Sequence, residues 1–358
     1  MLTLAREARG LTQAELASRA RIAQGSLSKI ENGIAMPSAE VVGDLANVLG
    51  YPPEFFALSG QPYGLPPFHY RKRKKLSAKA LGRIVAEINI RRMHVQLLTR
   101  SCGFDSTAAI PEIDREETVG KGRRPPSIED CARMIRESWL LPRGPIENLV
   151  DLIESHGGVV IPCDFGTDII DAVSQRIDGM PVLFFVNSAS PADRVRLTLA
   201  HELGHLVLHR ATLTDDDAME AEADEFAGAF LLPAEDIRPH LRRFDLRHLS
   251  NLKEYWRVSM GALAMRADRL GLISQYQSKM FWIEMSKLGY RKREPRELEP
   301  EEPKRLRRMV EFHERKLGYS KRDMARMLAL REDEFLSMYS TPTSGAAVAP
   351  GRLRLVKS

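Results

Sequence analysis

The sequence predicts a mainly α-helical protein of the α+β class with more than one domain. Residues 2–57 contain several short helical patterns separated by turn signals, and residues 199–207 and 219–232 form two further helix-favouring segments. Two short runs, at 159–162 and 182–186, are rich in β-branched and aromatic residues and predict strands of a small sheet. A chain of 358 residues, of which 43% are hydrophobic, is long enough for two or three domains with buried cores.

The N-terminal segment has the pattern of a helix-turn-helix. Thr12 and Glu15 stand at the spacing of a capping box, and Asn32-Gly33 is a typical end of a helix. A helix, a three-residue turn and a second short helix make this motif. The expected helices cover residues 2–9, 12–20, 24–31, 38–49 and 53–58. The apolar residues at helical spacing that would form one small core are Leu16, Ala17, Ile22, Leu27, Ile30, Val41, Leu45 and Leu49.

Residues Thr12–Ala17 and Ser26–Gly33 resemble the lambda-repressor/Cro-like family of the Xre type. The resemblance implies a recognition helix at Gln24–Glu31, and we expect double-stranded operator DNA bound by a homodimer. By matching position, one side chain would contact phosphate and four positions would face base edges; these are Gln13 and then Gln24, Gly25, Ser26 and Lys29. A helical bundle used only for dimerisation is the alternative.

The charge distribution bears on DNA binding. Residues 1–58 carry five basic and six acidic side chains, a net charge of −1, so this segment has no strong electrostatic footprint of its own. A basic cluster follows and is opposed by Glu87 alone; it comprises Arg71–Lys75, Lys79, Arg83, Arg91 and Arg92. This cluster could supply the phosphate contacts that the helix-turn-helix lacks. The alternative is a solvated linker and helix face.

The run His201-Glu202-Leu203-Gly204-His205 lies in a helix-forming segment. On a helix, His201 and His205 project from one face about one turn apart, which suits two imidazole nitrogens that bind one tetrahedral Zn²⁺ ion. Glu202 lies on the neighbouring edge, where it can deprotonate a water molecule as the catalytic base. A polar stripe on a surface helix is the alternative interpretation of the pattern.

A second acidic helical segment follows at Met219–Ala227. A zinc site with two histidines and one carboxylate takes its third ligand from such a downstream helix, and Glu220 is the candidate. Asp224, one turn later, could accept the N–H of a ligating imidazole and fix its tautomer. Glu222 lies on the other side of the helix as a solvated charge, although the two glutamates could have reversed roles. An ordinary solvated helix face would also account for the acidic run.

The segments His201–His205, Glu220–Ala227 and Leu231–Pro233 together resemble the ImmA/IrrE family of bacterial zinc endopeptidases. The resemblance extends over about residues 141–290. It implies a small thermolysin-like zincin fold, with a short β-sheet packed on two ligand-bearing helices. It also implies a protein substrate, since members of the family cleave a repressor and so switch on genes.

Two neighbouring features admit alternatives. The strand at 182–186 would be an edge strand that aligns an extended substrate by backbone pairing, or else an interior strand. His209 stands on the same side of the helix as His205, but the sequence lacks the glycine turn and later histidine of a three-histidine site. We therefore expect His209 to be partly buried and not a ligand.

The rest of the chain is expected to be largely helical, at 76–100, 127–140, 146–156, 252–274 and 317–339, with an exposed, salt-bridged helix at 291–316. Turn-rich residues 60–67 and the loop at 105–126 are candidate hinges. Three cysteines without C-x-x-C pairing indicate reduced thiols. No signal peptide and no apolar run of about 18 residues is recognised, so we expect a cytoplasmic protein without a membrane partner.

The sequence thus favours a DNA-binding transcription regulator fused to a zinc-dependent endopeptidase that cleaves a repressor or another regulatory protein, in cis or in trans. The alternative is a regulator whose zinc domain is a non-cleaving sensor or protein-interaction module. The expected divisions are a helix-turn-helix domain at 1–58, a basic linker and helical connector at 59–140, the peptidase domain at 141–290, a C-terminal helical region at 291–340 and a disordered tail at 341–358.

Overall fold

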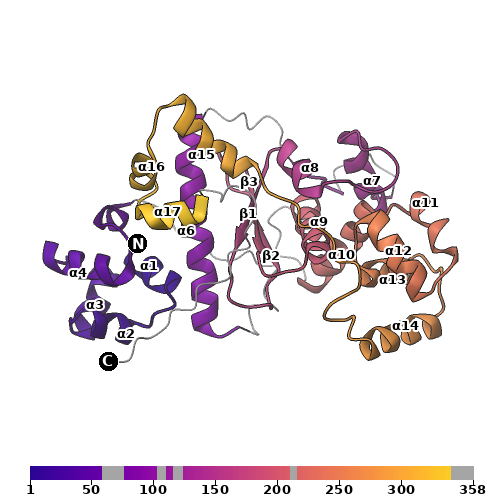
Figure 1. The fold of residues 1–358 in the computed structure, drawn as a ribbon, viewed down its shortest axis with the longest axis horizontal. Helices are drawn as coiled ribbons and strands as arrows, with labels where there is room; N and C mark the ends of the chain where they lie inside the picture. The colour runs from indigo at the N-terminus through magenta and orange to yellow at the C-terminus, as the bar shows by residue number, and fades with distance from the viewer. Residues whose placement is uncertain (59–75, 103–109, 116–123, 210–215, 340–358) are drawn as a thin grey trace.

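The computed structural model describes residues 1–58, 76–102, 110–115, 124–209 and 216–339. Figure 1 shows the N-terminal helices at one end, the long helix α6 beside them, a small sheet in the middle, and a group of helices at the other end. The mainly α, α+β architecture that the sequence predicts is confirmed. In the described parts of the chain, no helix is long and apolar enough to cross a membrane.

The N-terminal helices have the predicted order. Thr12 accepts a hydrogen bond from the backbone N–H of Glu15, and the Glu15 carboxylate accepts one from the N–H of Thr12, so the predicted capping box is present. Leu16, Leu27 and Leu45 are buried in the core of this unit. The elements are α1 (Leu2–Ala8), α2 (Gln13–Arg19), α3 (Gln24–Glu31), α4 (Ala39–Leu49) and the 3-10 helix η1 (Pro53–Ala57).

Helix α6 (Ala78–Cys102) lies between α1 and the sheet, and three C-terminal helices complete this layer (Figure 1). They are α15 (Arg305–Lys316), α16 (Lys321–Met327) and α17 (Glu332–Tyr339). The prediction of an exposed helix over 291–316 is wrong, because the helix begins at Arg305 and buries Met309, Val310 and His313. Prolines at 295, 300 and 303 explain the late start, since proline lacks the backbone N–H that a helix requires.

The sheet has three strands in the order β1-β3-β2. Strand β1 (Gly158–Cys163) runs parallel to β3 (Val182–Asn187), and β2 (Ala172–Gln175) runs antiparallel to β3. Alternate side chains of β3 enter two different cores, with Leu183 on the α6 side and Phe184 on the opposite side. Because β3 is the central strand, the hypothesis that residues 182–186 form a substrate-pairing edge strand is wrong.

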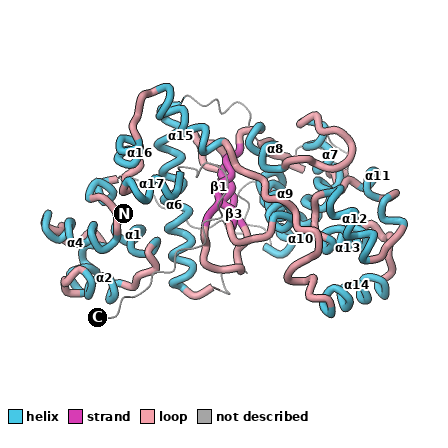
Figure 2. The backbone as a smooth tube through the Cα atoms, in the orientation of Figure 1, coloured by secondary structure: helices cyan, strands magenta, loops and turns pink. Residues whose placement is uncertain are grey.

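The opposite face of the sheet is covered by α9 (Ala192–Leu208), and α10 (Asp216–Leu231) lies beside α9 (Figure 2). The other elements of this half are α7 (Ile128–Ser138), α8 (Leu149–Ser155), α11 (Ala234–Ile237), the 3-10 helix η3 (His240–Arg242), α12 (Leu246–Trp256), α13 (Met260–Arg269) and α14 (Gln275–Lys287). The helical structure predicted over 252–274 is present as the end of α12 and as α13, and Trp256, Val258 and Leu263 pack into the core.

One hydrophobic core joins the N-terminal helices, α6, one face of the sheet and the C-terminal helices. The division of the chain at residues 58 and 290 therefore stays a prediction, since residues on both sides of each boundary share this core. The turn-rich residues 60–67, the basic run Arg71–Lys75 and the expected tail at 341–358 lie outside the described residues. Cys131 and Cys163 are buried free thiols.

Candidate metal centre and DNA-facing surface

The predicted DNA-reading positions lie on one exposed face of α3. Gln24, Gly25, Ser26 and Lys29 are exposed, whereas Leu27 is buried. This face is therefore available to a partner, as a recognition helix requires.

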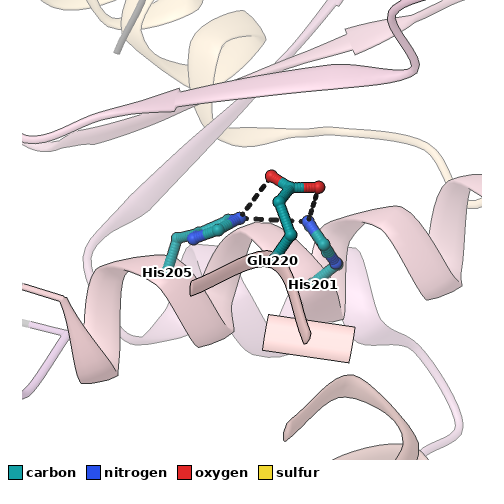
Figure 3. Close-up of side chains that lie close together, drawn as sticks. All are labelled: His201, His205 and Glu220. Atoms are coloured by element: carbon teal, nitrogen blue, oxygen red, sulfur yellow. Dashed lines mark hydrogen bonds and ion pairs between the residues drawn. The ribbon is translucent and has the colours of Figure 1, made fainter. Parts of the chain in front are cut away.

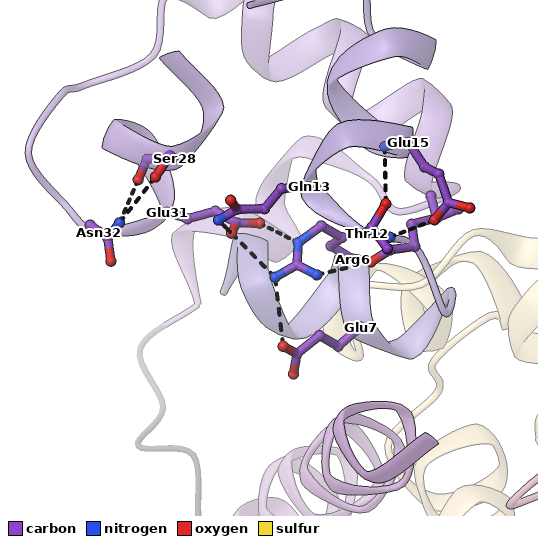
Figure 4. Close-up of polar contacts among 9 residues, drawn as sticks. Arg6, Glu7, Thr12, Gln13, Glu15, Ser28, Glu31 and Asn32 are labelled. Atoms are coloured by element: carbon purple, nitrogen blue, oxygen red, sulfur yellow. Dashed lines mark hydrogen bonds and ion pairs between the residues drawn. The ribbon is translucent and has the colours of Figure 1, made fainter. Parts of the chain in front are cut away.

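Glu31 ties this helix to its neighbours. Its carboxylate accepts hydrogen bonds from Arg6 Nε at 2.6 Å and from Gln13 Nε2 at 2.7 Å, as Figure 4 shows. The side chain of Arg6 is only 11% exposed, so this ion pair is mostly shielded from water. It fixes α1, the start of α2 and the end of α3 relative to one another. The Gln13 amide group already donates to Glu31, so a phosphate contact by Gln13 would have to use the same amide group.

The basic residues on α6 face other parts of the chain. Arg92 is 3% exposed and donates to Asn89, and Arg91 donates to Glu87 at 2.8 Å. Phosphate contacts by Arg91 and Arg92 are therefore excluded, because α6 is buried between the N-terminal helices and the sheet. Two further residues of the predicted basic cluster, near the start of α6, form ion pairs with carboxylates, Lys79 with Glu15 and Arg83 with Asp164.

Helices α9 and α10 bring three candidate ligands together (Figure 3). His201 and His205 rise from one face of α9, with their Nε2 atoms 3.0 Å apart, and Glu220 of α10 points between them. Glu220 Oε1 lies 3.3 Å from His205 Nε2, and Glu220 Oε2 lies 3.8 Å from His201 Nε2. Gly204 allows the close approach of the two helices, since a Cβ atom at this position would meet Phe226 Cβ at 3.1 Å and Ala223 Cα at 3.2 Å.

Asp224 orients the first histidine. Its Oδ1 lies 2.7 Å from His201 Nδ1, which turns His201 Nε2 towards the other two candidate ligands. Burial lowers the pKa of His201, but hydrogen bonds to Asp224 and Glu220 outweigh that effect and raise the pKa to about 9. Such a carboxylate behind an imidazole fixes the tautomer that a metal needs.

Glu222 points to different partners. Its Oε1 accepts a hydrogen bond from Arg115 at 2.7 Å, and its Oε2 lies 3.8 Å from His209 Nδ1. His209 Nε2 lies 3.2 Å from the Met219 carbonyl oxygen. Neither residue belongs to the group that His201, His205 and Glu220 form.

Glu202 lies on the sheet side of α9 and is fully buried. Its Oε2 accepts hydrogen bonds from the backbone N–H of Ser174 at 2.9 Å and from Ser174 Oγ at 2.7 Å. Ser174 belongs to the edge strand β2, so the open edge of the sheet borders the site. Sequence reasoning missed both Ser174 and β2, because the strand is only four residues long and its second half, Ser174 and Gln175, is polar.

The donor set fits zinc. The ligand atoms of His201, His205 and Glu220 lie within 4.8 Å of one another, so one ion could contact all three. Two imidazoles and one carboxylate are the protein ligands of an open zinc site, in which a fourth position remains for water or substrate.

Comparison with known families agrees with this geometry. Residues 153–268 match the model of peptidase family M78, described as the IrrE N-terminal-like domain, and residues 2–56 match a helix-turn-helix model. No curated protein matches the chain. The chain therefore joins a helix-turn-helix domain to a metallopeptidase-like domain. More particularly, residues 153–268 match the IrrE N-terminal-like model, which describes the same family that the sequence motifs resemble.

Proposed function

We propose that the chain is a cytoplasmic DNA-binding transcription regulator and a zinc-dependent endopeptidase that cleaves a regulatory protein, with a repressor as the first candidate. The observation that carries the peptidase proposal is the convergence of His201, His205 and Glu220 beside the buried carboxylate of Glu202. A carboxylate at that place can act as the base that deprotonates water beside a metal ion. The match of residues 153–268 to a peptidase family supports the same reaction class.

In this proposal His201, His205 and Glu220 hold the metal ion, and Asp224 orients His201 through Nδ1. A bound zinc ion supplies Lewis acidity, which lowers the pKa of water and polarises a carbonyl group. The Glu202 carboxylate takes up the proton of the attacking water and delivers it to the leaving amine nitrogen. Ser174 holds Glu202 Oε2 and so keeps the carboxylate in one orientation.

Strand β2 replaces β3 as the element that aligns the substrate. The backbone N–H of Ser174 leaves the sheet to reach Glu202, so the open edge of β2 lies next to the site. An extended peptide that adds to this edge would pass over the ligand-bearing face of α9.

The helix-turn-helix domain would direct this activity to DNA as a homodimer. Gln24, Gly25, Ser26 and Lys29 would face the bases, and Gln13 would contact phosphate. Their exposure on α3, together with the match of residues 2–56 to a helix-turn-helix model, supports the placement.

The non-cleaving alternative rests on one observation. The two hydrogen bonds from Ser174 give Glu202 a structural role in joining α9 to β2, which a sensor domain would also use.

The test compares the unmodified protein with Glu202→Gln and with Glu222→Gln, which makes the same chemical change on α10. Each form is expressed in cells, and loss of mass of candidate repressors is followed by mass spectrometry, with the zinc content of the purified proteins measured in parallel. We expect all three forms to retain zinc and only Glu202→Gln to lose cleavage. If the unmodified protein retains zinc but cleaves none of the candidate repressors, the result favours the sensor alternative.

A further inference from the structure

Helices α16 and α17 repeat the arrangement of α2 and α3. Helices α2 and α16 are both seven residues long, and α3 and α17 are both eight residues long. Each helix of the second pair begins 308 residues after its counterpart, Lys321 after Gln13 and Glu332 after Gln24. The two pairs therefore align without an insertion or a deletion.

The first helix of each pair begins with the same cap. The Ser320 hydroxyl accepts a hydrogen bond from the backbone N–H of Asp323 at 3.2 Å, and the Asp323 carboxylate accepts one from the N–H of Ser320 at 2.9 Å. Thr12 and Glu15 form the same capping box at the corresponding positions before α2. The same local chemistry thus specifies the start of both helices.

The turn and the core correspond as well. Arg21 and Ala329 hold the same place in the two turns, with φ of 55° and 51°, a conformation that residues other than glycine adopt uncommonly. Leu27 of α3 and Phe335 of α17 are both fully buried at corresponding positions. Two helices joined by such a short turn are a helix-turn-helix. Residues 320–339 therefore form a second helix-turn-helix unit, which lies beside the first unit in Figure 1.

The two units carry different charges at corresponding positions. On the first helix, neutral residues of the first unit correspond to exposed cations of the second; the pairs are Gln13 and Lys321, Ala14 and Arg322, and Ser18 and Arg326. At the start of the second helix, neutral residues correspond to carboxylates; the pairs are Gln24 and Glu332, Gly25 and Asp333, and Ser26 and Glu334. The first unit thus has the side chains to face bases, and the second has the cations to face phosphates.

Helix α17 holds the second unit against the first and does not read DNA. Three carboxylates at its start would be repelled by the phosphates that flank a DNA groove. Glu334 forms an ion pair with Arg9 of α1 at 2.8 Å, and Arg331 donates to the carbonyl oxygen of Ala46 in α4 at 3.3 Å. These contacts fix the second unit to the N-terminal helices and leave the cations of α16 exposed.

A phosphate contact fits the start of α16. Lys321 stands where the first unit has Gln13, the residue expected to contact phosphate, and it adds a full positive charge there. Arg322 and Arg326 stand four residues apart and so share one face of the helix. Asp323 lies among these cations, but its carboxylate is held at the helix end by the capping box.

We propose that α16 binds the phosphate backbone of duplex DNA through Lys321, Arg322 and Arg326, as a contact surface additional to the reading helix α3. The inference rests on the proposed DNA-binding function and names the part of the chain that supplies electrostatic affinity. Residues 1–58 carry a net charge of −1 and lack such a surface. The second unit supplies it in the same chain.

The experiment measures binding of the full-length protein to two fluorescent duplexes, one obtained by a binding selection and one of random sequence, by anisotropy between about 50 and 200 mM salt. The combined variant Lys321→Gln, Arg322→Gln and Arg326→Gln should reduce the steepness of log affinity against log salt by about 2 to 3 per bound chain, because each phosphate contact contributes about 0.9. The loss of affinity should be equal for both duplexes, since phosphate contacts carry no sequence information directly.

Two matched variants test whether position and charge matter. Arg269→Gln, Lys279→Gln and Lys287→Gln together remove the same charge from exposed residues of α13 and α14, at the other end of the molecule (Figure 1), and should leave the salt dependence unchanged. Exchange of lysine and arginine at the three α16 positions keeps the charge and should also leave it unchanged.

The outcomes separate this inference from the proposed DNA binding. An unchanged salt dependence in the α16 glutamine variant, or an equal reduction in the α13–α14 variant, overturns the α16 contact while DNA binding by the first unit stands. Failure of the unmodified protein to bind either duplex overturns both. If the combined α16 variant does not fold, Arg322→Gln alone takes its place, with an expected reduction of about 0.9, and no reduction would count against the contact.

Discussion

Gly204 and Gly228 offer a paired test of how the metal centre is built, since each lies on one of the two ligand-bearing helices. A Cβ atom at Gly204 would lie 3.1 Å from Phe226 Cβ and 3.2 Å from Ala223 Cα, so α9 and α10 would have to separate. At Gly228 it would lie 3.8 Å from Arg266 Cδ, with no need for movement. Both Gly→Ala changes gain the same intrinsic helix propensity, about 0.5–1 kcal/mol.

The gain in helix propensity cancels when the stabilities of the two variants are compared. The difference that remains is the cost of overpacking at residue 204. Overpacking typically destabilises by ~1–3 kcal/mol, so we expect Gly204→Ala to be less stable than Gly228→Ala by that amount. Gly228→Ala alone should be slightly more stable than the unmodified protein. The free energy of unfolding in urea of the chelated, metal-free proteins measures both values.

Zinc affinity gives a second measurement on the same variants. Separation of α9 and α10 moves Glu220 away from His201 and His205, so Gly204→Ala should bind zinc more weakly, whereas Gly228→Ala should bind it normally. Two variants that agree within about 0.5 kcal/mol in stability, the usual range for changes away from special features, would refute the close-approach argument.

Three further predictions concern other parts of the chain. Asp224→Ala should weaken zinc binding about 10- to 100-fold in a chelator competition, with Glu222→Ala unchanged; equal affinities would contradict the role of Asp224. Burial, followed by the charge of Arg91, lowers the pKa of His94 to about 3 in the folded protein. In the unfolded chain the pKa of this histidine is about 6.5, so as the pH falls below that value His94 takes up a proton in the unfolded chain but not in the folded protein. Stability should therefore drop by about 2 kcal/mol between pH 7 and pH 5, and an equally steep drop in His94→Asn would rule out this source. Lys29→Ala should lose ~1–3 kcal/mol of discrimination against wrong bases in a binding selection, and an intact preference would move the reading surface elsewhere.

The sequence predicted those parts of the molecule that local chemistry determines. The capping box at Thr12 depends on residues three apart, and its hydrogen bonds are present. His201 and His205 stand four apart on one helix, so a single helix suffices to bring them together. Glu220 needed a second helix, but the acidic helical pattern at 219–227 and the family resemblance both indicated it. Spacing alone could not exclude Glu222 as the third metal ligand. The direction of its side chain depends on a hydrogen bond from Arg115, which lies far away in the sequence.

Long-range packing decided the features that the sequence did not predict. Strand β2 has little signal of its own and is extended because β3 pairs with it. The order of the strands places β3 in the centre, and no pattern within residues 182–186 indicates that. Arg91 and Arg92 looked like a basic surface, yet the position of α6 between two layers buries them. For α6 the layers that determine the outcome lie far away in the chain, whereas β2 and β3 are close in sequence and only their pairing makes β2 a strand.

The packing of the helix-turn-helix domain also limits how DNA binding and proteolysis could be coupled. The turn-rich residues 60–67 suggested a module that swings towards and away from the zinc centre, but α1 packs on α6 and the two share one core with the sheet. Arg9 strengthens this attachment, since it donates to the Leu49 carbonyl oxygen and forms an ion pair with Glu334 of α17. To swing the module away would expose this core to water, which apolar burial strongly opposes. Under the proposed function, control of cleavage would therefore act at the metal centre itself and not through a change in the distance between the two domains.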